Sequence, residues 1–262
     1  MPRKATVLLA DERRREILKI LKRDGRLSVE DLVERFRVSA VTLRSDLGQL
    51  ADEGHLVRSY GGAIPAQDPA EDFPLRVKQS LHYAEKVRIA QAAARIVQPN
   101  QTVILDSGTT SAEVARAMKR RNLGALTIIT HALNIAQEFL NSPLTSVIVV
   151  GGVLRHVSAS AVGPQAERMI RELGAHHFFL GVDGLTPELE LATPDVLEAQ
   201  LNTVMMQVAE ETTVIADGSK FGRRSLSPIG KVDRVKRVIT DSSADAELVS
   251  RIRERGVEVI VV

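Results

Sequence analysis

Short hydrophobic runs alternate with longer amphipathic stretches over residues 101–262. The runs are rich in valine and isoleucine, and roughly 10 to 20 residues separate most of them. They read TVILD, LTIIT, SVIVV, HHFFLGV, TVIAD, RVIT and VEVIVV. Strands that alternate with helices in this way predict an α/β domain whose mostly parallel sheet is covered by helices on both faces. In such sheets ligands bind beyond the carboxyl ends of the strands.

The N-terminal region, up to about Tyr60, has apolar side chains at helical spacing instead. A first helix is predicted over residues 11–24. A second is predicted after Ser28 and a third after Ser39, because serine is a favourable N-cap. The sequence HLVRSYGGAI, which follows, predicts a short hairpin. Three helices and a hairpin in this order predict a winged helix-turn-helix.

Prolines separate these two regions. Residues 65–80 hold three of the ten prolines and few apolar side chains, which is typical of a linker. A helix is predicted from about residue 81 to 97. We therefore expect a winged helix-turn-helix domain over residues 1–64 and an α/β effector-sensing domain over residues 81–262.

The third helix of the N-terminal region is the candidate DNA-reading element. Val41, Leu43, Leu47 and Leu50 are expected to point inward. Its N-terminal end would enter the major groove, where Arg44 can make two hydrogen bonds to a guanine. The candidate DNA-binding residues, wing included, are Ser39, Ala40, Thr42, Arg44, Ser45, Arg58, Gly61 and Gly62. The alternative is an ordinary amphipathic helix on which Arg44 is a solvated charge.

Composition excludes several kinds of site. The chain has 262 residues and no cysteine, so disulfides, thiolate nucleophiles and cysteine-ligated zinc are excluded. Its six histidines include no HExxH pair, and we expect neither a metal nor a cofactor. No run of about 18 apolar residues occurs, so we expect a cytoplasmic protein without a membrane span. From Met1 to Tyr60 the chain carries 13 Lys and Arg against 10 Asp and Glu, a net charge of +3 that suits contact with phosphates.

Polar residues follow several predicted strands. Asp106 ends an apolar strand, and residues 107–110 then open a helix whose free N–H groups and dipole would attract a phosphate. The alternative is ordinary capping of that helix by serine and threonine. Lys220 follows another strand and would add a cation at the same phosphate, unless it is a surface lysine.

Carboxylates and an amide recur on the C-terminal side. Asp183 follows the run FFLGV, whereas Asp195, Glu198 and Asn202 share one face of a predicted helix. Such groups suit sugar hydroxyls or an amino group, and a solvated helix face is the alternative.

The chain resembles the DeoR family of bacterial transcriptional repressors over nearly its whole length. Residues 12–63 include the pattern S-x-x-T-L-R-x-D-L, from Ser39 to Leu47, which is highly specific to that family. Residues 76–240 resemble its sensor domain, which is similar in fold to ribose-5-phosphate isomerase. The resemblance implies effector-binding roles for Asp106, Ser107, Gly108, Thr109, Thr110, Thr130, Asn134, Gly152, Asp183, Glu198 and Lys220.

The resemblance also implies partners. They are a double-stranded DNA operator, a phosphorylated sugar that releases the protein from DNA, and further copies of the chain in a dimer or tetramer. Asp46, an acid beside DNA, is expected to pair with a neighbouring arginine and to orient it. The ten residues from Thr193 to Asn202 resemble the AgaR-like branch of the family, which controls amino-sugar catabolism. We therefore expect a repressor of a carbohydrate-catabolism operon whose effector is a phosphorylated sugar, in this branch an amino-sugar phosphate.

The alternative function is enzymatic. Acids and a lysine around a bound sugar can move protons, as in a sugar-phosphate isomerase with an appended DNA-binding module. An isomerase has no use for a DNA-reading helix, so we expect no enzyme activity.

Overall fold

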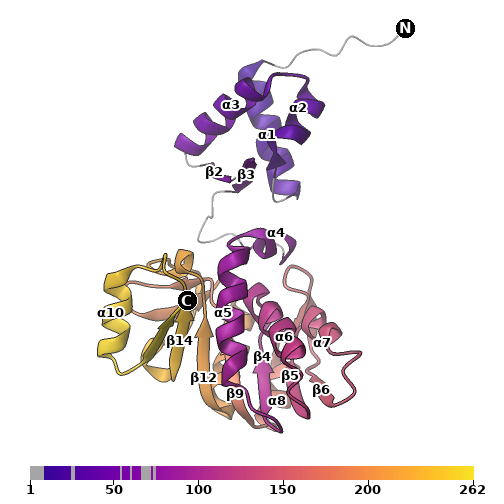
Figure 1. The fold of residues 1–262 in the computed structure, drawn as a ribbon, viewed down its shortest axis with the longest axis vertical. Helices are drawn as coiled ribbons and strands as arrows, with labels where there is room; N and C mark the ends of the chain where they lie inside the picture. Colours follow the sequence, from indigo (N-terminus) through magenta and orange to yellow (C-terminus); the bar gives the residue numbers. More distant parts are fainter. Residues whose placement is uncertain (1–8, 25–26, 54, 60, 66–71, 73–74) are drawn as a thin grey trace. The chain divides into compact units, whose positions relative to one another are not determined.

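The computed structural model describes residues 9–24, 27–53, 55–59, 61–65, 72 and 75–262. The chain divides into two compact units, residues 1–68 and 69–262, and each has a hydrophobic core of its own (Figure 1). Among the described residues, no helix has the length and apolar character needed to cross a membrane.

The N-terminal unit has three helices and a small antiparallel sheet. Its elements are α1 (Ala10–Asp24), β1 (Leu27–Ser28), α2 (Val29–Phe36), α3 (Ala40–Asp52), β2 (Leu56–Ser59) and β3 (Gly62–Pro65). The strand order is β1-β3-β2, so the hairpin of β2 and β3 follows α3 as a wing. This confirms the predicted winged helix-turn-helix.

Serine side chains begin both helices of the helix-turn-helix. Ser28 accepts a hydrogen bond from the backbone N–H of Asp31 at 3.0 Å, and Ser39 accepts one from that of Thr42 at 3.1 Å. Each bond satisfies an N–H group that the helix itself leaves without a partner. Arg37, in the left-handed region at φ 54°, ends α2 and turns the chain toward α3.

The inward face of α3 consists of leucines, and Val41 does not belong to it. The buried side chains are those of Leu43, Leu47 and Leu50. Val41 was expected to join them, but its side chain is 74% exposed. A helix turns by about 100° per residue, so Val41 lies roughly 200° around the axis from Leu43. It shares the outward face with Arg44 and Ser45, three and four positions later.

The C-terminal unit is built on seven parallel strands in the order β15-β14-β12-β9-β4-β5-β6. These strands are β4 (Thr102–Leu105), β5 (Leu126–Thr130), β6 (Thr145–Val149), β9 (Ala175–Leu180), β12 (Ala209–Ile215), β14 (Arg237–Thr240) and β15 (Glu258–Val261). The helices are α4 (Leu75–Ser80), α5 (Tyr83–Ile96), α6 (Thr109–Arg121), α7 (Leu133–Glu138), α8 (Pro164–Arg171), α9 (Val196–Val208) and α10 (Ala246–Glu254).

Smaller elements complete this unit. One hairpin pairs β7 (Val153–Arg155) with β8 (Ser160–Val162), and a second small sheet has the order β10-β11-β13. The remaining bounds are β10 (Gly184–Leu185), β11 (Glu190–Thr193), β13 (Ser227–Lys231) and the 3₁₀ turns η1 (Gly218–Lys220) and η2 (Val232–Arg234).

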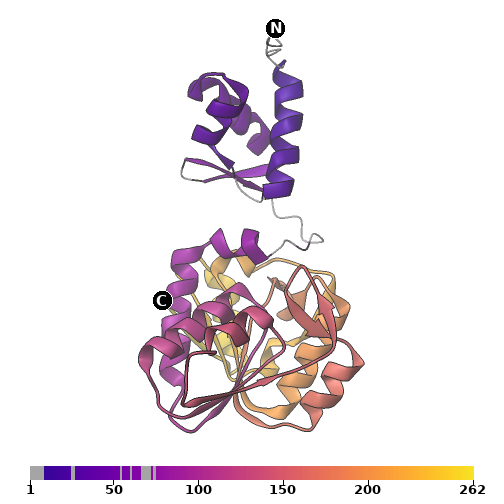
Figure 2. The ribbon, with the colours of Figure 1, turned by 90° about the vertical axis from the view of Figure 1, so that its right-hand side faces the viewer.

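Successive side chains of the central strands enter two different helical layers. In β4, Val103 and Leu105 pack with α5, α6 and α7, whereas Ile104 packs with α8, α9 and α10. Figure 2 shows the magenta helices α5 to α7 and the orange helix α9 on opposite sides of the sheet. Because both faces are covered, the consecutive residues Val103, Ile104 and Leu105 of β4 are all apolar and buried, as the sequence runs predict.

Part of the predicted linker belongs to the C-terminal unit. Residues 75–80 of the stretch 65–80 form α4, and Asp72 makes ion pairs with Lys78 and Arg155. Prolines indicate a break in the chain, but a helix can begin directly after one, as α4 does after Pro74. The helix expected over residues 81–97 is α5.

Candidate functional site

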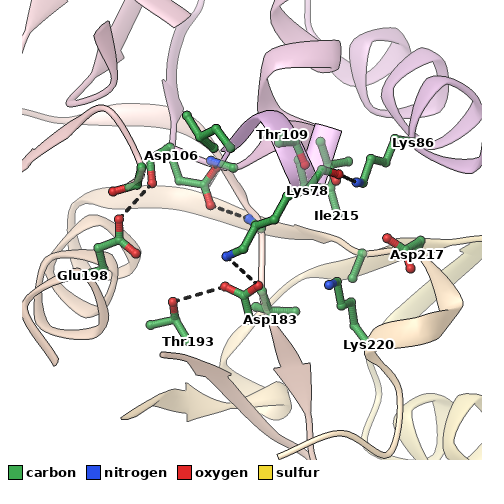
Figure 3. Close-up of a pocket in the computed structure, with 18 of the residues that line it drawn as sticks. Lys78, Lys86, Asp106, Thr109, Asp183, Thr193, Glu198, Ile215, Asp217 and Lys220 are labelled. Atoms are coloured by element: carbon green, nitrogen blue, oxygen red, sulfur yellow. Dashed lines mark hydrogen bonds and ion pairs between the residues drawn. The ribbon is translucent and has the colours of Figure 1, made fainter. Parts of the chain in front are cut away.

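A pocket lies at the carboxyl ends of three adjacent strands, β4, β9 and β12 (Figure 3). The residues that follow these strands face one another across it: Asp106 to Thr110 after β4, Gly181 to Asp183 after β9, and Ala216, Asp217 and Lys220 after β12. The free volume of the pocket is about 70 Å³. This is the edge at which the strand pattern predicts a ligand site.

Asp106 holds the loop after β4 in place. Its buried carboxylate accepts hydrogen bonds from the backbone N–H of Gly108 at 3.0 Å, from that of Gly181 at 2.6 Å, and from the hydroxyl of Ser111. Burial raises the pKa of Asp106, although these donors favour the ionised carboxylate. Asp106 therefore joins the loops after β4 and β9, rather than standing free for a ligand.

The N-terminus of α6 opens onto the pocket without a side-chain cap. Its N-cap residue is Gly108, which has no side chain that could accept from the N–H groups of the first turn, and at this cap Asp106 accepts only from the N–H of Gly108 itself. The serine and threonine capping considered as an alternative is therefore absent at this end. Thr109 and Thr110, the first two residues of α6, line the pocket. The N–H groups of the first turn and the positive end of the helix dipole thus lie at the pocket wall.

Lys220 is a pocket residue and not a surface lysine. Its side chain is partly buried, and among the described residues its ammonium has neither a hydrogen bond nor an ion pair. Burial lowers the pKa of Lys220, while Asp183 and Asp217 oppose that shift. Figure 3 shows Lys220 and Asp217 side by side beyond Asp183. A partly buried ammonium without a partner suits an anionic ligand.

Glu198 and its neighbours form a buried polar wall and not a solvated helix face. The Oε1 atom of Glu198 accepts hydrogen bonds from Ser107 at 3.3 Å and Ser160 at 3.1 Å, and lies 3.3 Å from Arg155 Nη1. Asp195 caps α9 and is 3.0 Å from Arg155 Nε. The Oδ1 atom of the buried Asn202 has no partner among the described residues. This wall therefore offers an open carboxylate oxygen and an unsatisfied amide to a ligand.

Sequence reasoning missed three cations of this site. Arg155 lies on the hairpin of β7 and β8, where no motif marks it. Lys78 of α4 lies 2.9 Å from Asp183 Oδ1 and 3.0 Å from Asp72 Oδ1, within the stretch predicted to be a linker. Lys86 of α5 donates to the carbonyl oxygen of Leu81 at 2.6 Å and to that of Lys78, and burial lowers its pKa to about 8. These three residues are far apart in the sequence or outside any motif, and only the fold brings them together.

Three predicted effector residues are not among those that line the pocket. Thr130 ends β5, and its hydroxyl accepts a hydrogen bond from the N–H of Ala132 at 3.1 Å. The Oδ1 atom of Asn134 is buried without a partner within the described chain. Gly152 packs against β8, where a Cβ would come 2.6 Å from the carbonyl oxygen of Val162. Backbone and packing contacts account for Thr130 and Gly152 without a ligand.

The outward face of α3 is the candidate DNA interface. Ser39, Arg44 and Ser45 are exposed, whereas Ala40 and Thr42 are partly buried. The Thr42 hydroxyl lies 2.9 Å from that of Ser39, so these two side chains form the N-terminal edge of the face. Hydroxyl and guanidinium donors therefore lie together on the helix end that the motif places in the major groove.

Asp46 pairs with arginines of α1 on the inner side of α3. Its carboxylate lies 2.6 Å from Arg13 Nε and 3.5 Å from Arg14 Nη1, and it is 3% exposed. This confirms the expected pairing, but the partners belong to α1. The ion pairs therefore fix the recognition helix to α1, rather than orienting a base-reading arginine.

The wing holds the remaining DNA candidates. Gly61 is in the turn at φ +80°, and a Cβ on Gly62 would overlap the carbonyl oxygen of Leu27. Gly62 is therefore needed for the close pairing of β3 with β1. The side chain of Arg58, on β2, lies outside the described side chains.

Comparison with known proteins agrees with both halves of the molecule. The profile of the DeoR-like helix-turn-helix domain matches residues 13–68, and that of the DeoR C-terminal sensor domain matches residues 81–242. The chain belongs to the DeoR family of transcriptional repressors. Among DeoR relatives, a putative aga operon transcriptional repressor of Escherichia coli O157:H7 is 38% identical over 253 residues, which are 96% of this chain and 93% of the relative.

Two more proteins show the range of similarity. The regulator GlpR of Haloferax volcanii is 33% identical and covers 97% of this chain and 98% of its own. Ribose 5-phosphate isomerase A from Neisseria gonorrhoeae superposes on 52% of each chain with a TM-score of 0.39 and 14% identity. That score is too low to support a conclusion, so the fold assignment rests on the sheet order and on the two DeoR profiles.

Proposed function

We propose that this DeoR-family repressor controls a carbohydrate-catabolism operon, and that a phosphorylated sugar bound in the pocket releases it from its operator. The observation that supports this most is the open N-terminus of α6 in the same pocket as Lys220, whose partly buried ammonium has no partner among the described residues. Helix N–H groups and a lysine are a favourable combination for a phosphate. The protein binds its operator as a homo-oligomer, a dimer or tetramer.

The finer proposal is that the sugar is an amino sugar. Glu198 and Asn202 form a polar wall on the α9 side of the pocket, across from Lys220. An amide oxygen without a partner and a second carboxylate oxygen are acceptors for hydroxyl and amide N–H groups. The 38% identity to a putative aga operon repressor supports the same branch.

A mobility-shift assay with a panel of sugars tests both levels. The panel holds galactosamine 6-phosphate, N-acetylgalactosamine 6-phosphate, ribose 5-phosphate, fructose 6-phosphate and the four free sugars. We expect only phosphorylated sugars to release DNA, and amino-sugar phosphates to act at the lowest concentration. Release by free sugars at equal concentration would contradict the phosphate site. Release only by the other two phosphates would contradict the amino-sugar proposal alone.

Variants separate the two ends of the pocket. Thr109→Ala and Lys220→Ala are each expected to weaken effector binding by about 1.5–3 kcal/mol, the usual loss for a charge-assisted hydrogen bond. Operator binding is expected to be unchanged, so these repressors are not induced. Glu198→Gln, which keeps the side chain's size, is expected to change which sugar is preferred. The matched control is Lys236→Ala, because Lys236 is exposed and is not among the residues that line the pocket.

An isomerase assay addresses the enzymatic alternative. With the same sugar phosphates we expect no turnover, because the relatives of this chain are named as regulators. Measurable conversion of any of them that is lost in Lys220→Ala would overturn the assignment as a repressor without enzyme activity.

A further inference from the structure

The segment that leads into the C-terminal unit, of which Asp72 and residues 75–82 are described, forms part of the pocket wall. The free volume is about 70 Å³, whereas pockets that hold small molecules usually measure about 300–1,000 Å³. The described residues of this segment that line the pocket are Asp72, Leu75, Lys78, Leu81 and His82. With this segment in place the pocket is smaller than sites that usually hold a small molecule, and movement of the segment would enlarge it.

Lys78 binds Asp183, one of the carboxylates that the sequence indicates for sugar hydroxyls. Its ammonium lies between two carboxylates, 2.9 Å from Asp183 Oδ1 and 3.0 Å from Asp72 Oδ1. Figure 3 shows the Lys78 side chain crossing the middle of the pocket to reach Asp183, with Thr193 on the other side of that carboxylate. Burial opposes the charge on Lys78, but Asp183 and Asp72 outweigh it and raise the pKa of Lys78. The ammonium is therefore a charged and well-bound occupant.

Two other cations, Arg155 and Lys86, bind residues of this segment. Arg155 forms an ion pair with Asp72, and the same guanidinium contacts Asp195 and Glu198 on the polar wall. Lys86 donates to the backbone carbonyl groups of Lys78 and Leu81, at the C-terminal end of α4. Arg155 thus connects Asp72 of the segment to Glu198 of the polar wall, and Lys86, which lines the pocket, holds the end of α4, so a ligand that rearranges the wall also loosens the segment.

We propose that Lys78 competes with the effector for Asp183, so that effector binding expels α4 from the pocket. This inference rests on the proposed function, because it assigns the regulation of the same site. The helix α4 begins seven positions after Asp68, the last residue of the N-terminal unit. The expelled segment thus belongs to the covalent connection to the DNA-reading unit. Lys78 therefore sets both the affinity for the effector and the coupling between effector binding and DNA binding.

The reactivity of an introduced thiol tests, without any ligand, whether Lys78 keeps this segment closed over the pocket. The chain has no cysteine, so Leu81→Cys places a single thiol at a buried position of this segment. Adding Lys78→Met is expected to raise the rate of modification by a disulfide reagent roughly tenfold, since one charge-assisted contact is worth about that factor. Adding Lys236→Met, an exposed lysine outside the pocket, is expected to leave the rate unchanged. Equal rates in the two double variants would overturn the proposal.

Hydrogen exchange provides the same test in chains with Leu81 intact. In full-length Lys78→Met, the amide groups of residues 78–82 are expected to exchange faster than in the unmodified chain, whereas those of β4 are not. Faster exchange in both regions would indicate general destabilisation and would contradict a local role for Lys78.

Effector titration tests the competition itself. The probe is galactosamine 6-phosphate, measured by calorimetry on the full chain. Competition predicts that Lys78→Met binds it more tightly, roughly tenfold, because the open state no longer has to be selected from a closed one. Weaker binding by Lys78→Met would mean that Lys78 is a direct ligand and would overturn the competition. If no sugar phosphate in the panel binds the unmodified chain, the proposed function fails, while the thiol and exchange results still decide whether Lys78 closes the pocket.

Discussion

Arg44 is the residue from which we expect most of the base reading. It is exposed, it lies one turn into α3, and it shares its face with Ser45. Arg44→Ala is expected to weaken operator binding by about 1–3 kcal/mol and to relax specificity at one base pair. The free energy of unfolding should be unchanged, because the Arg44 side chain is exposed and makes no contact with the core. The check is a mobility-shift titration beside Arg23→Ala, an exposed arginine at the end of α1. Equal losses in both variants would argue against a base contact.

Val41 is an apolar side chain on the same outward face, and it is 74% exposed. An exposed valine on a recognition helix suits the methyl group of a thymine. Val41→Ala is expected to cost about 1 kcal/mol of operator affinity, comparable to the transfer of one or two methyl groups. The test repeats the titration on an operator in which uracil replaces each thymine in turn. At the contacted position the valine and alanine proteins should then bind equally, and a uniform loss at all positions would exclude the methyl contact.

Among the elements, the wing depends on a close approach between β3 and β1. A Cβ on Gly62 would overlap the carbonyl oxygen of Leu27, which is backbone and cannot turn aside. Gly62→Ala is expected to destabilise the N-terminal unit by roughly 3 kcal/mol, as overpacking does. Gly61→Ala, with open space but a φ of +80°, should cost only about 1 kcal/mol. Hydrogen exchange of α1 to α3 in the full chain measures the destabilisation caused by each variant. A smaller destabilisation by Gly62→Ala than by Gly61→Ala would contradict the close contact between Gly62 and Leu27.

The corner between α4 and α5 contains a buried cation whose protonation depends on pH. Burial lowers the pKa of Lys86 from its ordinary 10.5 to about 8. Between these values the unfolded chain holds the proton and the folded one does not, so the free energy of unfolding increases with pH. The expected increase is about 1.4 kcal/mol for each pH unit between about 8 and 10.5.

Urea unfolding across this pH range measures that slope. Lys86→Met removes the titrating group, and the difference between the unmodified chain and this variant should grow with pH. Lys236→Met, at an exposed position, should track the unmodified chain. Parallel pH profiles for all three proteins would show that Lys86 is not the group responsible.

For the whole molecule, the uneven charge predicts salt-dependent DNA binding. The stretch from Met1 to Tyr60 has a net charge of +3 and the full chain +2, so phosphate contacts concentrate in the N-terminal unit. Operator affinity should fall steeply between roughly 50 and 200 mM salt, with a log–log slope of about −0.9 for each phosphate neutralised. A dimer, as proposed above, would double the number of phosphates that contribute to that slope. Mobility-shift titrations at several salt concentrations measure this slope directly. An operator affinity that does not change with salt would contradict electrostatic contacts between the N-terminal unit and DNA phosphates.

The sequence predicted the parts that depend on local signals. The strand pattern locates the pocket, Ser28 and Ser39 mark helix starts, and Lys220 follows a strand that ends at the pocket. Lys78 escaped prediction because its partner, Asp183, is more than 100 positions away and its own segment contains prolines. Val41 was misplaced because three leucines at a spacing of three and four residues already fill the inward stripe of α3. Local patterns thus predict where helices and strands lie. Long-range ion pairs, and which side of a helix faces the core, can be established only from the folded structure.

The strand order β15-β14-β12-β9-β4-β5-β6 has a consequence for the protein as it is synthesised. The pocket needs residues after β4, β9 and β12, so it cannot form until Lys220 has left the ribosome. The DNA-reading unit ends much earlier, at Asp68, and has its own core. At about 5–20 residues per second, the ribosome needs roughly 8–30 s to extend the chain from Asp68 to Lys220. During that interval a newborn molecule has a folded DNA-reading unit but no complete pocket, so no ligand of that pocket can act on it.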